Sequence, residues 1–144
     1  MDNSVTIKIK YFSDISPIEN NIFGDWIDLS AAKDIILNSG EFSLIPLGIG
    51  MILPDGYEAH LAPRSSTFIK YGIMQTNHIG IIDNSYSGEN DEWKMPVYSF
   101  RDTVIPKGSR ICQFRVVKKQ PDITFVTVDK LNDVSRGGFG STGK

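Results

Sequence analysis

The chain has 144 residues, of which 40% are hydrophobic and 22% are charged, and its formal net charge is -2. That size fits one domain spanning residues 1–144 and excludes two domains of ordinary size. No apolar run approaches the roughly 18 residues of a membrane span, and the first residues lack the basic and then apolar pattern of a signal peptide. We therefore expect a cytoplasmic protein with no membrane partner.

Charge is spread unevenly along the chain. Residues 101–144 carry nine basic and four acidic side chains, whereas residues 1–77 carry five basic and nine acidic ones. A basic excess of this density is too dilute to predict nucleic-acid binding. We expect no nucleic-acid partner.

Short β-like segments dominate the hydrophobic pattern. Apolar and polar residues alternate from Val5 to Tyr11, which predicts a first strand with one buried face. Turn signals such as Pro54-Asp55-Gly56 separate further β-like runs. These runs cover residues 42–53, 57–61, 80–82, 95–100, 111–117 and 123–128. Many short strands with frequent turns predict an all-β barrel or sandwich.

Helix signals are sparse. Residues 31–36 are followed too soon by Asn38-Ser39-Gly40 for a stable helix, so we interpret them as strand or loop. The hydroxyl residues 65–67 are able to cap a first turn, and Gly72 is suited to end it. One short helix is therefore predicted between them.

The glycine-rich tail from Arg136 to Lys144 is one candidate functional segment. Glycines let backbone amides approach phosphate oxygens, and Ser141, Thr142 and Arg136 add donors. Phe139 is suited to stack on a planar ligand. The alternative is a disordered, solubilising end.

A polar turn follows the β-like run 80–82. Asn84-Ser85 have turn chemistry, so a hairpin would place Asp83 and Tyr86 on opposite sides of its tip, facing a common pocket. There a carboxylate could deprotonate water, and a tyrosine ring could pack against a sugar. A solvated turn is the plainer interpretation.

Polar residues at three other places in the sequence are candidates for anion or cation binding. Arg64, Ser65 and Ser66 lie where the short helix begins and either bind an anion or form an ordinary cap. Gln113 interrupts an apolar run, which also fits a solvated strand face. Asp28 is able to bind a hard cation directly or through water, although a lone carboxylate is more often a surface residue.

Redox and zinc chemistry have little support in this composition. Cys112 is the single cysteine and lies in an apolar run, which predicts a buried, unreactive thiol. His60 and His78 lie eighteen residues apart without the spacing of metal ligands.

In this order, the segments resemble the five motifs of the trimeric dUTP diphosphatases (dUTPases), in a bacterial or phage-like variant. The matching segments are residues 24–32, 63–66, 77–89, 107–113 and 136–143. The resemblance implies a jelly-roll-like β-barrel with one short helix and a flexible C-terminal arm over about 130–144. It also implies a homotrimer whose subunits share active sites, with dUTP as substrate and Mg²⁺ as cofactor.

The resemblance further implies the role of each residue. Asp83 would orient water for in-line attack on the α-phosphorus, which releases dUMP and pyrophosphate, and Gln113 would contact the α-phosphate region. Tyr86 would pack under the deoxyribose, and Asp28 would hold Mg²⁺ through water. The remaining substrate-binding residues would be Arg64, Ser65 and Ser66 for phosphates, Asn77, Gly80 and Ile82 for uracil, Arg136, Ser141 and Thr142 for the γ-phosphate, and Phe139 stacked over uracil.

Two departures from the family pattern stand out. The tail has two residues fewer than usual between Arg136 and its Gly-Gly-Phe, which puts either the phosphate contact or the stacking of Phe139 in doubt. Residues 90–94 are inserted where the family continues directly into a strand, and they include Trp93. Trp93 is expected to be a core or interface residue, the alternative being a second aromatic near the site.

Two other functions remain open. The dCTP deaminase branch shares the barrel but attacks the pyrimidine ring, and the pairing of Asp83 with Tyr86 speaks against it. The other is a catalytically weak regulatory homologue that binds a repressor, a protein partner expected if the chain derives from a phage.

Overall fold

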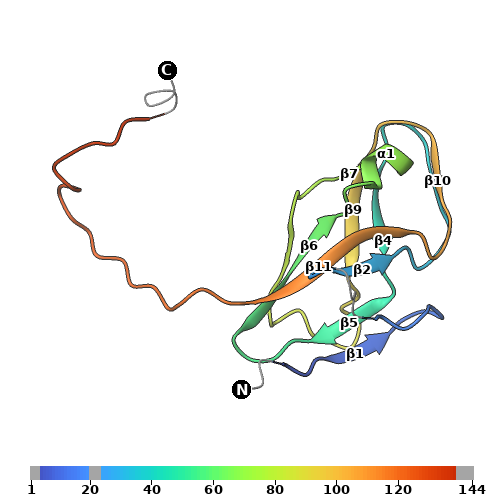
Figure 1. Ribbon diagram of the computed structural model, residues 1–144, viewed down its shortest axis with the longest axis horizontal. Coiled ribbons are helices and arrows are strands. Elements are labelled where there is room, and N and C mark those ends of the chain that lie inside the picture. The colour runs from blue at the N-terminus through green and yellow to red at the C-terminus, as the bar shows by residue number, and fades with distance from the viewer. Residues whose placement is uncertain (1–3, 20–23, 139–144) are drawn as a thin grey trace.

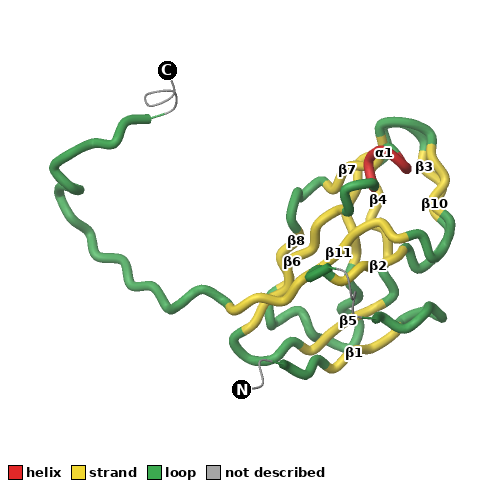
Figure 2. Tube along the Cα trace, viewed as in Figure 1, coloured by secondary structure: helices red, strands yellow, loops and turns green. Residues whose placement is uncertain are grey.

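The computed structural model describes residues 4–19 and 24–138. Short strands joined by loops make up most of the described chain, with a single short helix (Figure 2). The elements are β1 (Lys8–Tyr11), β2 (Ile27–Ser30), β3 (Ile35–Leu37), β4 (Phe42–Pro46), β5 (Ile49–Ile52), β6 (Tyr57–Pro63), α1 (Thr67–Tyr71), β7 (Ile73–Gln75), β8 (Gly80–Ile82), β9 (Lys94–Ser99), β10 (Thr103–Ile105) and β11 (Arg110–Lys118). The all-β prediction is confirmed.

All strand pairs are antiparallel and join segments that are far apart in sequence. One sheet has the order β2-β11-β6-β8 and another has β4-β9-β7, while β1 pairs with β5 and β10 with β3. The layers curve around a common interior and give the jelly-roll-like barrel (Figure 1). The apolar, β-branched run of β11 lies between β2 and β6 and joins them into one sheet.

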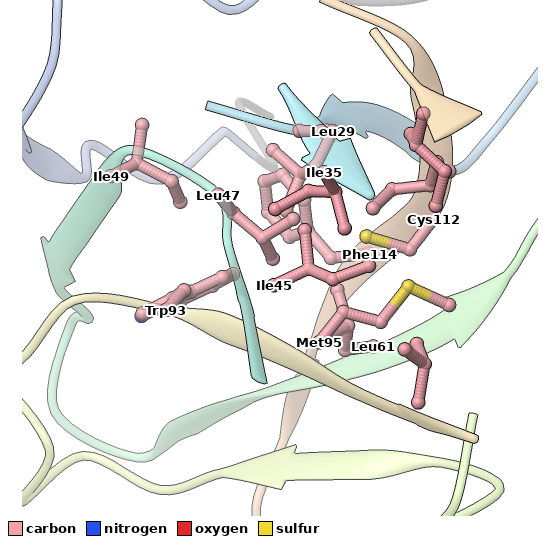
Figure 3. Packing of buried hydrophobic residues seen from close by; sticks show 14 of the residues in the cluster. Leu29, Ile35, Ile45, Leu47, Ile49, Leu61, Trp93, Met95, Cys112 and Phe114 are labelled. Carbon is pink, nitrogen blue, oxygen red and sulfur yellow. The ribbon is translucent and has the colours of Figure 1, made fainter. Parts of the chain in front are cut away.

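The interior is filled by aliphatic side chains around two aromatic rings (Figure 3). Trp93 and Phe114 are buried and meet edge to face, with ring centroids 5.2 Å apart. Trp93 is therefore a core residue, as expected. Cys112 is also buried, and burial raises the pKa of its thiol, so the prediction of an unreactive cysteine is confirmed.

The first strand differs from its prediction. β1 begins only at Lys8, and all four of its residues are exposed, including Ile9 at 37% and Tyr11 at 38%. Period-two alternation buries one face only where a second layer covers it. β1 pairs edge to edge with β5, and the exposure of all four residues shows that neither of its faces is packed against a second sheet. Ile7, just before the strand, packs against the core.

The predicted strand at residues 123–128 is wrong for this chain. After β11 the described chain extends away from the barrel (Figure 1), and residues 119–138 contain no strand. Phe125 is 89% exposed. A β-prone segment becomes a strand only when a partner edge accepts its hydrogen bonds, and the pairing of the chain with β6 ends at Lys118.

Other differences concern the shortest strands. β2, β7 and β10 have three or four residues, too few for an alternating pattern to be recognised in the sequence. The single run predicted at 42–53 is two strands, because Gly48 adopts a positive φ of 77° between β4 and β5.

The short helix lies where the sequence placed it, but its start is held differently. Ser66 is the N-cap residue and makes no side-chain capping bond. Instead the Arg64 N–H donates to Thr67 Oγ1 at 3.0 Å, and this hydroxyl donates to the carbonyl oxygen of Ile111 at 2.7 Å. The hydroxyl of Thr67 thus ties the entry of the helix to β11.

Gly72 ends the helix with φ 67°, and a Cβ there would lie 2.7 Å from Cγ of Arg101. The Arg101 guanidinium donates to the carbonyl oxygens of Ile69 and Lys70, at 3.1 and 2.7 Å. We expect Gly72→Ala to lower the free energy of unfolding by about 2–3 kcal/mol, because conformational strain adds to displacement of this cap. Urea denaturation at fixed protein concentration measures the loss.

Gly56 provides the matched control. It has φ 82°, and a Cβ there would meet nothing within 4 Å. Gly56→Ala therefore isolates the backbone strain, and we expect it to cost about 1 kcal/mol. Equal losses at the two glycines would contradict the role given to Arg101.

Candidate active site

One group of polar side chains converges where β6 ends. In the register of the sheet, Gln113 of β11 lies opposite Asp28 of β2 on one side and opposite Ala62 of β6 on the other. Arg64 follows the last residue of β6, and Arg110 begins β11. Pairing of three distant strands thus brings Asp28, Arg64, Arg110 and Gln113 together, and we call these four residues the arginine cluster.

Ion pairs and hydrogen bonds hold the arginine cluster. Asp28 Oδ1 lies 3.2 Å from Arg64 Nε, and Asp28 Oδ2 lies 3.6 Å from Arg110 Nη1. Gln113 Nε2 donates to the carbonyl oxygen of Pro63 at 3.2 Å. Two guanidinium groups face one carboxylate, so the cluster keeps a net positive charge. A site of this kind suits an anion with several oxygens, such as a phosphate chain.

The predicted residues Ser65 and Ser66 belong to the same region. They connect Arg64 to α1, with Ser65 exposed and Ser66 partly exposed. Arg110, in contrast, had no predicted role. Its place in the same sequence segment as Gln113 was the signal that pointed to it, but only the strand pairing shows it beside Asp28.

A second group of residues lies in the turn after β8. The Ser85 backbone N–H donates to Asp83 Oδ1 at 2.8 Å, and the Ser85 hydroxyl donates to the same oxygen. These bonds stabilise the ionised form and lower the pKa of Asp83 below its ordinary value. Asn84 fixes the turn by donating to the carbonyl oxygens of Leu53 and Pro54, at 2.9 and 3.0 Å. The turn therefore presents an ionised carboxylate in a defined place.

Asp83 faces an open cleft of about 880 Å³. Tyr57, Ser85 and Lys119 also contribute to its lining. Tyr86 is not among the residues that line this cleft. The predicted hairpin is wrong. β8 pairs with β6, and the next strand, β9, belongs to the other sheet, because residues 83–93 cross between the two layers as a loop.

Tyr86 is held by the inserted segment instead. Its hydroxyl donates to the carbonyl oxygen of Glu92 at 2.8 Å, while 40% of the side chain stays exposed. Partial burial, with smaller contributions from the charges of Asp91 and Glu92, raises the pKa of Tyr86. The phenol therefore remains a protonated donor at neutral pH.

The turn that precedes β8 carries the other residues expected to read a base. Asn77 and His78 form it, and His78 adopts a positive φ of 59°. Gln75 is buried and donates through Nε2 to the carbonyl oxygens of Leu61 and His78, at 2.9 and 3.3 Å. Gln75 was not among the predicted residues, and its signal in the sequence was a polar residue next to an apolar pair.

The two groups lie at opposite ends of β6. Ile82 pairs with Ala59, so Asp83 lies beside the start of the strand, whereas Arg64 follows its end. Arg64 is five positions after Ala59, which corresponds to roughly 16 Å along a strand. In one chain the Asp83 turn and the arginine cluster therefore lie at different places along β6.

The C-terminal candidates are only partly described. Arg136 is exposed, in the strand-free part of the described chain that follows β11. Phe139, Ser141 and Thr142 lie outside the described residues.

Residues 4–19 and 24–138 contain no group of three or more His, Cys, Asp or Glu side chains able to hold a metal ion. Within the same ranges no helix has the length and apolarity that a bilayer span requires.

The geometry defines the class of protein: a jelly-roll-like barrel with a positively charged cluster and a separate carboxylate turn. The sequence matches the dUTPase family over residues 26–143. It is 54% identical over 138 residues to the SPbeta prophage-derived deoxyuridine 5'-triphosphate nucleotidohydrolase YosS of Bacillus subtilis, covering 95% of this chain and 97% of that protein. It is 40% identical over 133 residues to the deoxyuridine 5'-triphosphate nucleotidohydrolase of Finegoldia magna, covering 88% and 90%. The chain belongs to the dUTPase family.

Solved structures show the same fold. A mutant of the Staphylococcus bacteriophage 80alpha dUTPase with dUpNHpp has a TM-score of 0.78 at 21% identity, covering 98% of this chain and 100% of that one. A mutant dUTPase from phage phi11 of S. aureus, described with a structural Mg(II) ion, has a TM-score of 0.74 at 17% identity, covering 88% and 100%.

Proposed function

We propose that this protein hydrolyses dUTP to dUMP and pyrophosphate. The observation that carries the proposal is the Asp83 turn, in which two donors from Ser85 keep the carboxylate ionised at an open cleft. Asp83 takes a proton from water, the water oxygen bonds to the α-phosphorus, and the bond from that phosphorus to the bridging oxygen breaks. Pyrophosphate leaves with the electron pair of that bond.

The residues around β8 are suited to recognise the nucleoside. Tyr86 presents a half-exposed ring that would pack under the deoxyribose and leave no room for a 2′-hydroxyl. The backbone at Asn77, Gly80 and Ile82 would bond the uracil edge, where a cytosine mismatches the donors and a thymine methyl is crowded. A free nucleotide substrate also suits the expected cytoplasmic location.

The arginine cluster is suited to bind the triphosphate. Arg64, Ser65 and Ser66 would contact the phosphate chain, and Gln113 would bond the α-phosphate region. Both oxygens of Asp28 already face arginines. Asp28 would therefore hold Mg²⁺ only through water. Bound there, the ion would neutralise charge on the phosphates.

We further propose a homotrimer in which each site combines groups from different subunits. The separation of Asp83 from the arginine cluster along β6 in one chain supports this arrangement, since both groups are expected to act near the α-phosphate. The extended C-terminal segment is suited to reach a neighbouring subunit. There Arg136, Ser141 and Thr142 would grip the γ-phosphate and Phe139 would cover the uracil.

Pyrophosphate release with magnesium from dUTP, compared with dCTP, dTTP and UTP, tests the activity. Fast release from dUTP alone is expected. Ammonia released from dCTP would assign the protein to the deaminase branch instead. If none of the four nucleotides is turned over, the result would favour the second candidate, a protein-binding homologue. This candidate is supported by the prophage origin of a relative.

Complementation tests the shared site. Asp83→Asn and Arg64→Ala trimers are each expected to be nearly inactive. Equal amounts of the two variants are unfolded together and refolded into mixed trimers. A site is then intact if an Arg64→Ala chain supplies its Asp83 and an Asp83→Asn chain supplies its Arg64. Random assembly gives about one quarter of the wild-type activity, because a site receives an intact Asp83 in half of the cases and, independently, an intact Arg64 in half of the cases.

A second mixture controls for nonspecific recovery. Asp83 and Tyr86 belong to the same turn of one chain, so mixing Asp83→Asn with Tyr86→Ala should restore nothing. Recovery in this mixture, or none in the first, would contradict the division of the site between subunits.

A further inference from the structure

In the inserted segment 90–94, one peptide group contacts both Tyr86 and the barrel. The carbonyl oxygen of Glu92 accepts the Tyr86 hydroxyl at 2.8 Å. The N–H on the other side of the same peptide bond, that of Trp93, donates to the carbonyl oxygen of Ile49 at 2.8 Å. A peptide group is planar, so fixing its N–H direction also fixes the direction of its carbonyl.

Two more contacts hold this peptide group. The Glu92 side chain accepts the N–H of Gly48 through Oε2 at 3.0 Å, and Gly48 is buried. The Leu47 N–H donates to the carbonyl oxygen of Trp93 at 3.0 Å, and the indole of Trp93 lies in the core. The acceptor for Tyr86 is thus anchored to the connection between β4 and β5 from both of its flanks.

We propose that Glu92 is a positioning residue that sets discrimination against ribonucleotides by fixing the ring of Tyr86 through this peptide group. The inference rests on the proposed function, in which that ring lies under the deoxyribose. A side chain with two rotatable bonds excludes one extra hydroxyl only while its ring cannot shift. The hydrogen bond from the Tyr86 hydroxyl to an immobile acceptor restricts rotation of the ring. A ribose 2′-hydroxyl would then clash with the ring.

The experiment measures kcat/KM for dUTP and for UTP and compares their ratio between variants. Tyr86→Phe removes the donor and leaves the ring, and Glu92→Ala releases the peptide group from Gly48. We expect each to lower the dUTP to UTP ratio by roughly 3- to 10-fold, the factor that corresponds to one hydrogen bond. Kd values for the non-hydrolysable imido analogues of the two nucleotides give the same comparison without turnover.

Two variants separate positioning from a general loss of structure. Glu92→Gln keeps an oxygen acceptor for the Gly48 N–H and should restore the ratio to within about twofold of wild type. Lys94→Ala removes an exposed charge at the end of the same insertion, and it should leave the ratio unchanged.

The outcomes distinguish this inference from the function on which it rests. A Glu92→Ala protein with lower stability and an unchanged ratio would show a merely structural role and overturn the inference. An unchanged ratio in Tyr86→Phe would overturn it as well. If the wild-type protein prefers neither dUTP over UTP nor the dUTP analogue over the UTP analogue, this result would contradict the proposed function and also the inference that rests on it.

Discussion

Asp83→Asn is expected to lower kcat for dUTP by roughly 10²- to 10⁴-fold, the range lost with a general base. Asparagine keeps the shape of the side chain and an oxygen able to accept the Ser85 bonds, but it cannot take a proton from water. The base and phosphate contacts come from other residues, so the Kd for a non-hydrolysable dUTP analogue should change little. Single-turnover kinetics together with calorimetric titration measure the two quantities separately.

A neighbouring carboxylate provides the control for Asp83. Asp55 is exposed on the turn after Pro54, whose carbonyl oxygen accepts a bond from Asn84. Asp55→Asn changes the same charge close by and should keep kcat within about threefold of wild type, because screened surface charges act weakly. Turnover by Asp83→Asn at near the wild-type rate would contradict the proposed mechanism. An equal loss of kcat in Asp55→Asn would show that the loss in Asp83→Asn is an effect of local charge.

Phe114→Ala is expected to lower the free energy of unfolding by about 3–5 kcal/mol. Phe114 is 2% exposed, packs edge to face against Trp93, and lies on β11 between Leu61 and Ile27 of the neighbouring strands. Removing the ring takes away buried apolar surface and leaves a cavity that the surrounding strands cannot close. Urea midpoints at one fixed protein concentration measure the change.

The control at this position keeps most of the volume. Phe114→Leu should cost less than about 1.5 kcal/mol, because a large aliphatic side chain refills most of the space. A loss below about 1 kcal/mol for Phe114→Ala would mean that the barrel is not organised around the contact between Trp93 and Phe114.

Much of the secondary structure was predictable because its signals are local. β8 and α1 were placed correctly, and the boundaries of β6, β9 and β11 within one or two residues. Their causes are alternation, β-branched content and a glycine that stops a helix. β1 and the segment 123–128 were misjudged for one common reason, since burial and pairing depend on a partner surface that a local pattern does not contain.

The candidate site was foreseen as residues but not as an arrangement. Motif spacing pointed to Asp28, Arg64, Asp83, Tyr86 and Gln113, and their roles remain predictions. It did not indicate Arg110 beside Asp28, Gln75 under the turn before β8, or the Glu92 carbonyl beneath the Tyr86 hydroxyl. Each of these contacts joins segments through packing that no short pattern encodes.

By itself, the sequence determined the all-β class, the place of the helix and membership of the dUTPase family, and it pointed to candidate site residues. The tertiary structure alone decided that Asp28, Arg64 and Gln113 meet at one end of β6 while Asp83 lies near the other. It also decided that the inserted segment holds Tyr86. The physical reason is that strand register is a long-range property, set by how β2, β6, β8 and β11 bury their apolar faces together.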